Sequence, residues 1–288
     1  MTILGRTHDQ ALKWLHRNIP TQLTPEGRIL IFADVALGDL CFLLPVINAL
    51  KDRPHTVVCN NPDRQEVIRL LTPHVESLES LPAIRGDYGT VICNFQQQWT
   101  TIVKKVLNLK IPCRIGHWWR EKYQWVFNQK IPYLTNYHRH IVNEWLLWPF
   151  GIHYPEPVKL EVPNPALLWD VLIAPFSDNG IGNKDWVGHG AVEKILRSRG
   201  YRVGAVEGRW DMKFLCRAIA GSKLVIGNDS GLPKLADAMG VPAIQIHLNH
   251  GPCEPRVSGV LHGQNLTDPT VDEVVNLARK ILERKGDR

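Results

Sequence analysis

The sequence predicts an α/β protein with two doubly wound, Rossmann-like domains in tandem. Three observations carry this prediction: short apolar runs alternate with helical segments, the alternation stops in a proline-rich stretch, and it then restarts. The chain has 288 residues, enough for two domains at roughly 150 residues each. Its composition, 44% hydrophobic and 22% charged, is typical of globular proteins and excludes collagen-like, coiled-coil and disordered classes.

The first half opens with a strand and a βαβ unit. In the run from Arg28 to Ala33, residues 29–33 are apolar at successive positions, as expected of a strand buried on both faces of a parallel sheet. Helical spacing over 39–51 and a second apolar run at 55–60 complete the unit. The alternation continues with a helix, a strand and a helix at 62–71, 90–95 and 100–109.

Four prolines between residues 154 and 165 disfavour both helix interiors and central strands. We interpret this stretch as an interdomain linker, with domains over 1–156 and 157–288. The second half then alternates again. We expect strands at 170–175, 201–206, 223–227 and 242–247, and helices at 190–199, 211–220, 231–239 and 270–283. Doubly wound sheets bind ligands at the carboxyl ends of their strands, so we expect a ligand in a cleft between the domains.

Charge and cysteine content bear on the partners and the compartment. The net charge of +6 and the pI of about 9.0 favour anionic partners such as phosphates, nucleic acid or an acidic membrane surface. No signal-peptide pattern and no apolar run of membrane-spanning length appears, which predicts a cytoplasmic protein. The six cysteines include no CxxC pair and are expected to be free, buried thiols.

Several nucleotide-binding and hydrolase motifs are missing. The loop after residue 175 has Gly180 and Gly182, but Asp185 stands where the third glycine of the dinucleotide fingerprint belongs. No glycine-rich loop ends in Gly-Lys-Ser/Thr, and no Gly-x-Ser-x-Gly elbow is present. These absences argue against NAD or FAD binding, P-loop kinases and esterases.

Asp39 is the first candidate for chemistry. It follows Gly38 in the turn after the first strand, where a carboxylate would face the expected cleft. One interpretation makes Asp39 a general base. The other makes it a helix N-cap, because Asp favours that position without any substrate.

The segment 224–234 combines a strand, a polar turn and a helix start. Free amides and the positive end of the dipole at such a start suit a phosphate, and Ser230, Gly231 and Lys234 add a hydroxyl, close backbone access and a cation. The alternative is an ordinary capped helix of an α/β fold. Pro233 fits both interpretations, because proline suits a first helical turn.

A basic, aromatic stretch covers residues 100–140. Its eight basic residues, set against the single acid Glu121, are Lys104, Lys105, Lys110, Arg114, Arg120, Lys122, Lys130 and Arg139. They could grip an anionic acceptor by charge and ring stacking, or form a solvated face over packed tryptophans. His138 and His140 lie two residues apart without a Cys, Asp or Glu at ligand spacing, which disfavours a metal site.

Four ordered motifs together resemble glycosyltransferase family nine, the bacterial lipopolysaccharide heptosyltransferases. They are the opening segment 28–51 with its Gly-Asp and Leu-Pro, the Arg-x-Gly at 114–116, the Lys-x-Trp at 184–186, and the block 225–242. The resemblance covers about residues 28–280.

That resemblance implies a GT-B fold with an acceptor-binding N-terminal domain and a nucleotide-sugar-binding C-terminal domain. It also implies an inverting transfer that needs no metal and no cofactor beyond the donor, which in the family is ADP-heptose. The usual acceptor is the anionic lipopolysaccharide core at the cytoplasmic face of the inner membrane, where the protein would be peripheral.

Carried over by position, the resemblance assigns roles to individual residues. Asp39 becomes the base, and the acceptor would meet the basic residues Arg120, Lys122 and Lys130. The donor-binding residues would be Ser177, Lys184, Glu207, Asp229, Ser230, Gly231 and Lys234.

Two departures from the family pattern keep alternatives open. Lys234 replaces the family's histidine, and the turn Asp34-Val-Ala-Leu37 lacks its usual lysine and serines. One alternative is a glycosyltransferase acting on modified DNA or another polyanion, which the basic stretch also permits. The other is a nucleotide-sugar-binding protein without catalysis.

Overall fold

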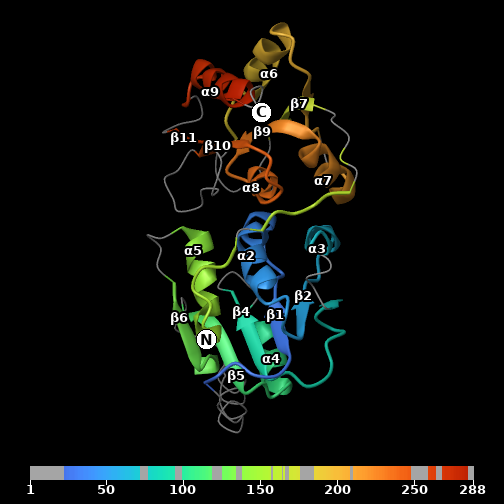
Figure 1. Ribbon diagram of the computed structural model, residues 1–288, viewed down its shortest axis with the longest axis vertical. Helices are drawn as coiled ribbons and strands as arrows, with labels where there is room; N and C mark the ends of the chain where they lie inside the picture. Colours follow the sequence, from blue (N-terminus) through green and yellow to red (C-terminus); the bar gives the residue numbers. More distant parts are fainter. Residues whose placement is uncertain are drawn as a thin grey trace, which may run out of the picture. The chain divides into compact units, whose positions relative to one another are not determined.

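The computed structural model describes residues 23–71, 77–94, 99–118, 125–133, 138–156, 158–163, 165, 169–175, 185–207, 210–247, 259–263 and 268–284. The chain packs as two compact units, each around a parallel sheet (Figure 1). The first contains Met1–Val35 and Phe42–Pro157, and the second contains Ala36–Cys41 and Val158–Arg288.

The sheet of the first unit has six parallel strands in the order β3-β2-β1-β4-β5-β6. The strands are β1 (Ile29–Phe32), β2 (His55–Val58), β3 (Ser77–Glu79), β4 (Thr90–Cys93), β5 (Cys113–Trp118) and β6 (Gln129–Pro132). The helices are α2 (Leu37–Ala49), whose residues up to Cys41 belong to the second unit, α3 (Pro62–Arg69), α4 (Trp99–Asn108), α5 (Arg139–Glu144) and a 3₁₀ helix (Trp145–Phe150).

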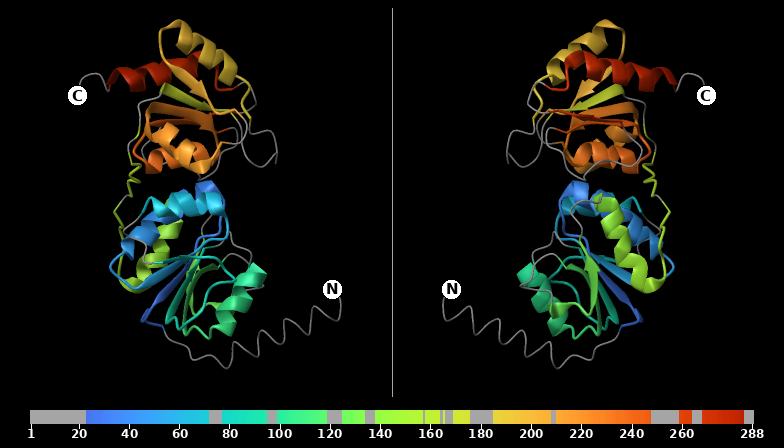
Figure 2. Two further views of the ribbon diagram at one scale, coloured as in Figure 1. Left: turned by 90° about the vertical axis from the view of Figure 1, so that its right-hand side faces the viewer. Right: turned by 90° about the vertical axis from the view of Figure 1, so that its left-hand side faces the viewer.

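Both faces of this sheet are covered. Leu30 and Phe32 of β1 pack in one buried cluster with Val103 and Val106 of α4. Figure 2 shows α4 on one side of the sheet and α2 and α5 on the other. The fully apolar strand β1 therefore follows from its central place in a sheet that is buried on two sides.

The sheet of the second unit has five parallel strands in the order β11-β10-β9-β7-β8. The strands are β7 (Trp169–Ala174), β8 (Val203–Ala205), β9 (Ser222–Asn228), β10 (Ala243–His247) and β11 (Gly259–His262). The helices are α6 (His189–Ser198), α7 (Met212–Ala220), α8 (Gly231–Ala238) and α9 (Val271–Arg284).

Helices α6 and α9 share one face of this second sheet. Their buried side chains pack with the inward-facing residues of β7, β9 and β10 in a single core cluster. Helices α7 and α8 contact the opposite face, on the other side of the strands (Figure 2). The α/β class and the parallel, doubly wound sheets expected from the sequence are therefore confirmed in both units.

One helix boundary changes the interpretation of a site residue. Helix α2 begins at Leu37, two residues earlier than expected, and the Leu40 N–H already bonds the Ala36 carbonyl at 2.9 Å. Asp39 therefore lies inside the first helical turn and is not an N-cap.

The described residues also bear on the expected state of the cysteines and on membrane-spanning segments. Cys41, Cys59, Cys93, Cys113 and Cys216 are buried and free, which confirms that expectation for these five cysteines. In the part of the chain that the structure describes, no helix is both long and apolar enough to span a membrane.

Candidate functional site

The end of β9 and the start of α8 form the centre of the candidate site. Strand β9 finishes at Asn228, Asp229 and Ser230 make the turn, and α8 begins at Gly231. A Cβ at Gly227 would lie 3.0 Å from both Pro233 Cγ and the Ala174 carbonyl oxygen. Glycine at this position lets α8 lie close against the sheet, which brings the first turn of the helix to the strand ends.

Asn228 ties this turn to the neighbouring strand. It is fully buried, and its Nδ2 donates to the Pro175 carbonyl at 2.6 Å and to Asp185 Oδ1 at 3.2 Å. Its Oδ1 accepts from the Trp186 N–H at 3.2 Å and from His189 Nε2 at 2.9 Å. Sequence reasoning did not single out this residue, although an amide at the end of an apolar strand was a visible signal.

Trp186, the last residue of the Lys-x-Trp motif, packs inside the second unit. Its ring is buried, donates from Nε1 to the Pro269 carbonyl at 2.8 Å, and meets His189 edge to face at 5.1 Å. Trp186 therefore holds the segment before α6 against the loop before α9. Burial lowers the pKa of His189. Lys184 of the same motif lies outside the described residues, as does Ser177.

A buried charged cluster lies between α8 and β10. Lys234 Nζ donates to Asp229 Oδ1 at 2.5 Å, and their side chains are only 8% and 11% exposed. Gln245 Nε2 donates to the same oxygen at 3.3 Å, and His247 Nε2 lies 3.4 Å from Asp229 Oδ2. The structure thus brings together Asp229 and Lys234, both expected from the sequence, and adds Gln245 and His247, which were missed.

The start of α8 supplies further polar groups beside this cluster. Ser230 occupies the N-cap with extended backbone angles, but its side chain makes no capping hydrogen bond. Within the described residues, the buried Ser230 hydroxyl oxygen has no hydrogen-bond partner. Ser230, Gly231 and the helix amides therefore offer donors to an anion, since the first N–H groups of a helix have no intrahelical partner.

Glu207 is placed apart from the cluster. It is exposed and follows β8, which is separated from β9 by β7 in the sheet. Two strand spacings amount to roughly 10 Å. The structure therefore does not bring Glu207 into contact with Asp229, but it places both at the carboxyl edge of one sheet.

Comparison with known proteins identifies the architecture. No protein-family model and no curated protein sequence matches this chain. Among solved structures, the E. coli ADP-heptose lipopolysaccharide heptosyltransferase II superposes with a TM-score of 0.70 at 15% identity, covering 90% of this chain and 100% of that one. The family 9 glycosyl transferase of Veillonella parvula gives a TM-score of 0.74 at 15% identity, covering 92% and 99%. The E. coli heptosyltransferase WaaC with ADP gives a TM-score of 0.70 at 16% identity, covering 88% and 100%.

The chain has the heptosyltransferase fold. This confirms the fold that the four ordered motifs implied. In that heptosyltransferase fold, Asp39 is buried in the first turn of α2.

The Arg-x-Gly motif has a structural role in this heptosyltransferase fold. Arg114 is fully buried, and its guanidinium donates to the backbone carbonyls of Val126 and Ile111, each at 2.7 Å. A Cβ at Gly116 would lie 2.5 Å from the Phe127 ring. The prediction that Arg114 belongs to an anion-binding basic stretch is therefore wrong, because the backbone of its own unit occupies the guanidinium.

The remaining basic stretch is described only in part. Lys130 of β6 is exposed, while Arg120 and Lys122 lie outside the described residues. The His138 and His140 rings stack at 5.6 Å between centroids. No group of three His, Cys, Asp or Glu side chains that could hold a metal ion occurs in the described ranges.

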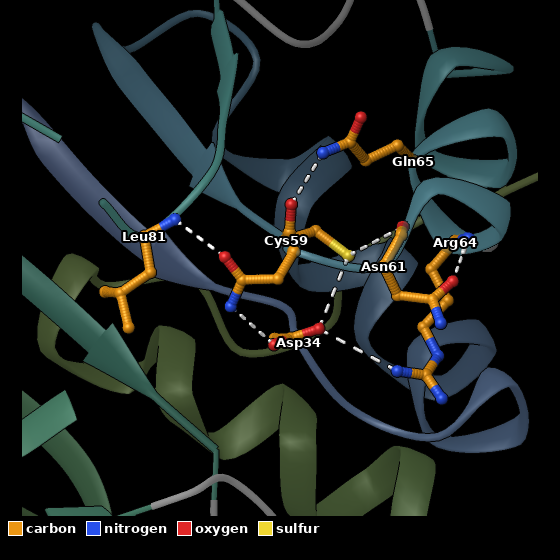
Figure 3. A network of polar contacts seen from close by, with 7 residues as sticks. Asp34, Cys59, Asn61, Arg64, Gln65 and Leu81 are labelled. Carbon is orange, nitrogen blue, oxygen red and sulfur yellow. Dashed lines mark hydrogen bonds and ion pairs between the residues drawn. The ribbon is translucent and has the colours of Figure 1, made fainter. Parts of the chain in front are cut away.

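The first unit has its own polar network at the carboxyl edge of its sheet, drawn in Figure 3. Asp34 accepts from Asn60 Nδ2 at 2.8 Å and lies 3.8 Å from Arg64 Nη1. Cys59 Sγ is 3.9 Å from Asp34 Oδ1, and burial raises the pKa of this thiol to about 11. Asn61 caps α3 by accepting from the Arg64 N–H at 3.1 Å. This network fixes the turn after β1, where the family pattern has a lysine and serines.

Proposed function

We propose that this chain is a glycosyltransferase that moves a sugar, expected to be heptose, from a nucleoside diphosphate donor to an anionic glycolipid such as the lipopolysaccharide core. The observation that carries the proposal is the buried Asp229–Lys234 pair at the start of α8, within a heptosyltransferase fold. A cation beside a helix N-terminus is suited to a diphosphate.

The donor end of the proposed site uses the second unit. The α8 amides, the Ser230 hydroxyl and the Lys234 ammonium would stabilise the diphosphate as it leaves, because negative charge develops there during transfer. Lys184 and Ser177 would add to this site. Glu207, at the same sheet edge, would meet the ribose of the nucleotide roughly 10 Å away.

The chemical step we propose is a direct displacement with inversion. Asp39 takes the proton of an acceptor hydroxyl while that oxygen forms a bond to the anomeric carbon. The bond from the anomeric carbon to the phosphate oxygen breaks, and the nucleoside diphosphate leaves with the electron pair. Since lysine and helix amides carry the developing charge, this mechanism needs no metal ion.

The acceptor side of the proposal rests on charge. The exposed Lys130, together with Arg120 and Lys122, would attract a phosphate- and carboxylate-rich acceptor at the membrane surface. Reversing these three residues to Glu is expected to raise the acceptor KM far more than it changes donor affinity. The wild-type advantage should shrink as salt rises, since exposed charges interact over only about 10 Å at 0.1 M. Equal acceptor kinetics at low salt would reject this part.

A nucleotide panel tests the donor assignment. ADP, UDP and GDP would each be added in a thermal-unfolding assay, because specific binding to the folded state raises Tm. We expect ADP alone to raise Tm, and ADP-heptose to be turned over with a lipopolysaccharide core acceptor. No response to any nucleotide would reject the proposal. ADP binding without turnover would favour a non-catalytic binding protein.

A further inference from the structure

Gln245 is a polar residue in a strand that is buried at every position. Strand β10 lies between β9 and β11, and Gln245 has no exposed surface. Ile244 and Ile246 point into the core shared with α6 and α9. Strand alternation therefore directs Gln245 and His247 to the opposite face, where α8 packs. A buried amide there costs free energy unless it is hydrogen-bonded.

The sheet register brings this amide under the turn that holds Asp229. Gln245 is paired with Gly227, and Ile246 with Asn228, so Gln245 lies beside the last residues of β9 and only His247 extends past its end. Gly227 has no side chain to fill the same face. The Gln245 side chain reaches Asp229 Oδ1 at 3.3 Å in consequence.

Asp229 is consequently held from two elements. Lys234 of α8 and Gln245 of β10 donate to the same carboxylate oxygen, while His247 lies beside the other oxygen. A carboxylate with a single partner can swing with that partner, whereas one bonded from a helix and a strand has its position fixed. Sharing Oδ1 with an amide also reduces the negative charge that Asp229 presents to the Lys234 ammonium.

We propose that Gln245 is a positioning residue of the donor site, which holds Asp229 and thereby fixes where the Lys234 ammonium meets the donor diphosphate. This inference rests on the proposed function, since it gives Lys234 the diphosphate as its partner. Gln245 does not touch the donor in this scheme. His247 Nε2 lies 3.4 Å from the second oxygen of Asp229.

The competing explanation is that Gln245 only satisfies buried groups and stabilises the sheet. A purely structural loss would lower the folded fraction and reduce the affinity for every nucleotide equally. A positioning role predicts a loss confined to the phosphate that Lys234 meets. Gln245→Met keeps the shape of the side chain and removes the amide, so ADP and AMP affinities of this variant separate the two explanations.

The experiment measures ADP and AMP binding by calorimetry, together with thermal unfolding. Gln245→Met is expected to weaken ADP binding about tenfold, the scale of one hydrogen bond to a charged group, with a much smaller change for AMP. In an Asp229→Asn/Lys234→Met background, adding Gln245→Met should change ADP affinity no further, because residues acting through one another are non-additive. Ser222→Ala, which removes a buried hydrogen bond at the start of β9, is the matched control and should leave both affinities unchanged.

The outcomes distinguish failure of the positioning role of Gln245 from failure of the proposed donor site. Equal losses for ADP and AMP, or an undiminished Gln245→Met effect in the Asp229→Asn/Lys234→Met background, would overturn the positioning role and leave the donor site standing. Unchanged ADP affinity in that background itself would overturn both. If Gln245→Met does not fold, Gln245→Asn keeps a polar amide but is one methylene shorter, so its N–H no longer reaches Asp229 and the same selective loss of ADP is expected.

Discussion

The two sheet edges of this protein carry similar charges in different surroundings. Asp34 follows β1 in the first unit and lies 3.8 Å from Arg64, with side chains 23% and 29% exposed. Asp229 follows β9 in the second unit and lies 2.5 Å from Lys234, with side chains 11% and 8% exposed. The first pair is reached by water, whereas the second is enclosed by α8 and β10.

That difference in burial determines what each pair can do. A charge pair that is exposed to water is weakly coupled, and its members can exchange partners at little cost in free energy. A buried pair is strongly coupled, and removing one partner leaves an uncompensated charge. The second edge is therefore the one able to hold a cation in a fixed position for a diphosphate.

The largest effect is expected at Asp39, the proposed general base. Asp39→Asn should lower turnover by about 10² to 10⁴ while donor affinity persists, the usual loss for a general base. Steady-state kinetics and calorimetry on the same variant measure both quantities. The matched variant Asp34→Asn, in the exposed network, should keep most of its turnover. If Asp34→Asn loses activity and Asp39→Asn does not, the base has been assigned to the wrong turn.

The next largest effect is expected when the buried Asp229–Lys234 pair is broken. Lys234→Met should destabilise the protein by about 3 to 5 kcal/mol, because Asp229 would remain buried with its charge uncompensated. Asp229→Asn/Lys234→Met should recover most of that loss, since a neutral replacement carries no such cost. Urea unfolding provides the measurement. A single variant as stable as the wild type would show that the pair is open to water.

Asp170, at the start of β7, is an intermediate case, with a half-exposed Lys223 and Arg202 beside a 12% exposed carboxylate. Burial alone raises the pKa of Asp170, but hydrogen bonds from Arg202 and Lys223 outweigh it and hold the pKa at about 2. A pKa below the unfolded value means that the ionised form stabilises the fold at neutral pH. That contribution is lost as the pH falls from about 4 towards 2.

The test of Asp170 is urea unfolding as a function of pH. Asp170→Asn should cost about 1 to 2 kcal/mol at pH 7, and the difference from the wild type should vanish near pH 2. The exposed Asp272→Asn serves as the control and should change stability by less than about 0.5 kcal/mol. A pH-independent cost of Asp170→Asn would contradict the electrostatic explanation.

The smallest effect is expected at the first edge. Arg64→Met should change stability by less than about 1 kcal/mol, because a partly exposed ion pair gains little over its hydrated partners. Its contribution should fall further in 1 M salt, whereas that of Lys234 should not. Denaturant unfolding of both variants at two salt concentrations checks this directly. If Arg64→Met lost as much stability as Lys234→Met, the distinction between the two sheet edges would be wrong.

Local sequence patterns were sufficient for the elements around the donor edge. The apolar run 223–227, the polar turn and the helix from Gly231 correspond to β9 and α8 within two residues. The stretch 110–150 was less informative, and β5, β6 and α5 were not predicted there. Its many tryptophans and basic residues obscure the alternation on which strand prediction depends.

The sequence by itself determined the α/β class, the Asp229–Lys234 turn and the position of Asp39 after the first strand. Only the tertiary structure decided that Arg114 faces backbone carbonyls, that Gln245 donates to Asp229 and that His247 lies beside it. The physical reason is that these contacts depend on the neighbours and the register of each strand. Strand order β11-β10-β9-β7-β8 is set by packing between distant segments, and no local pattern in β10 specifies which acid its amide will meet.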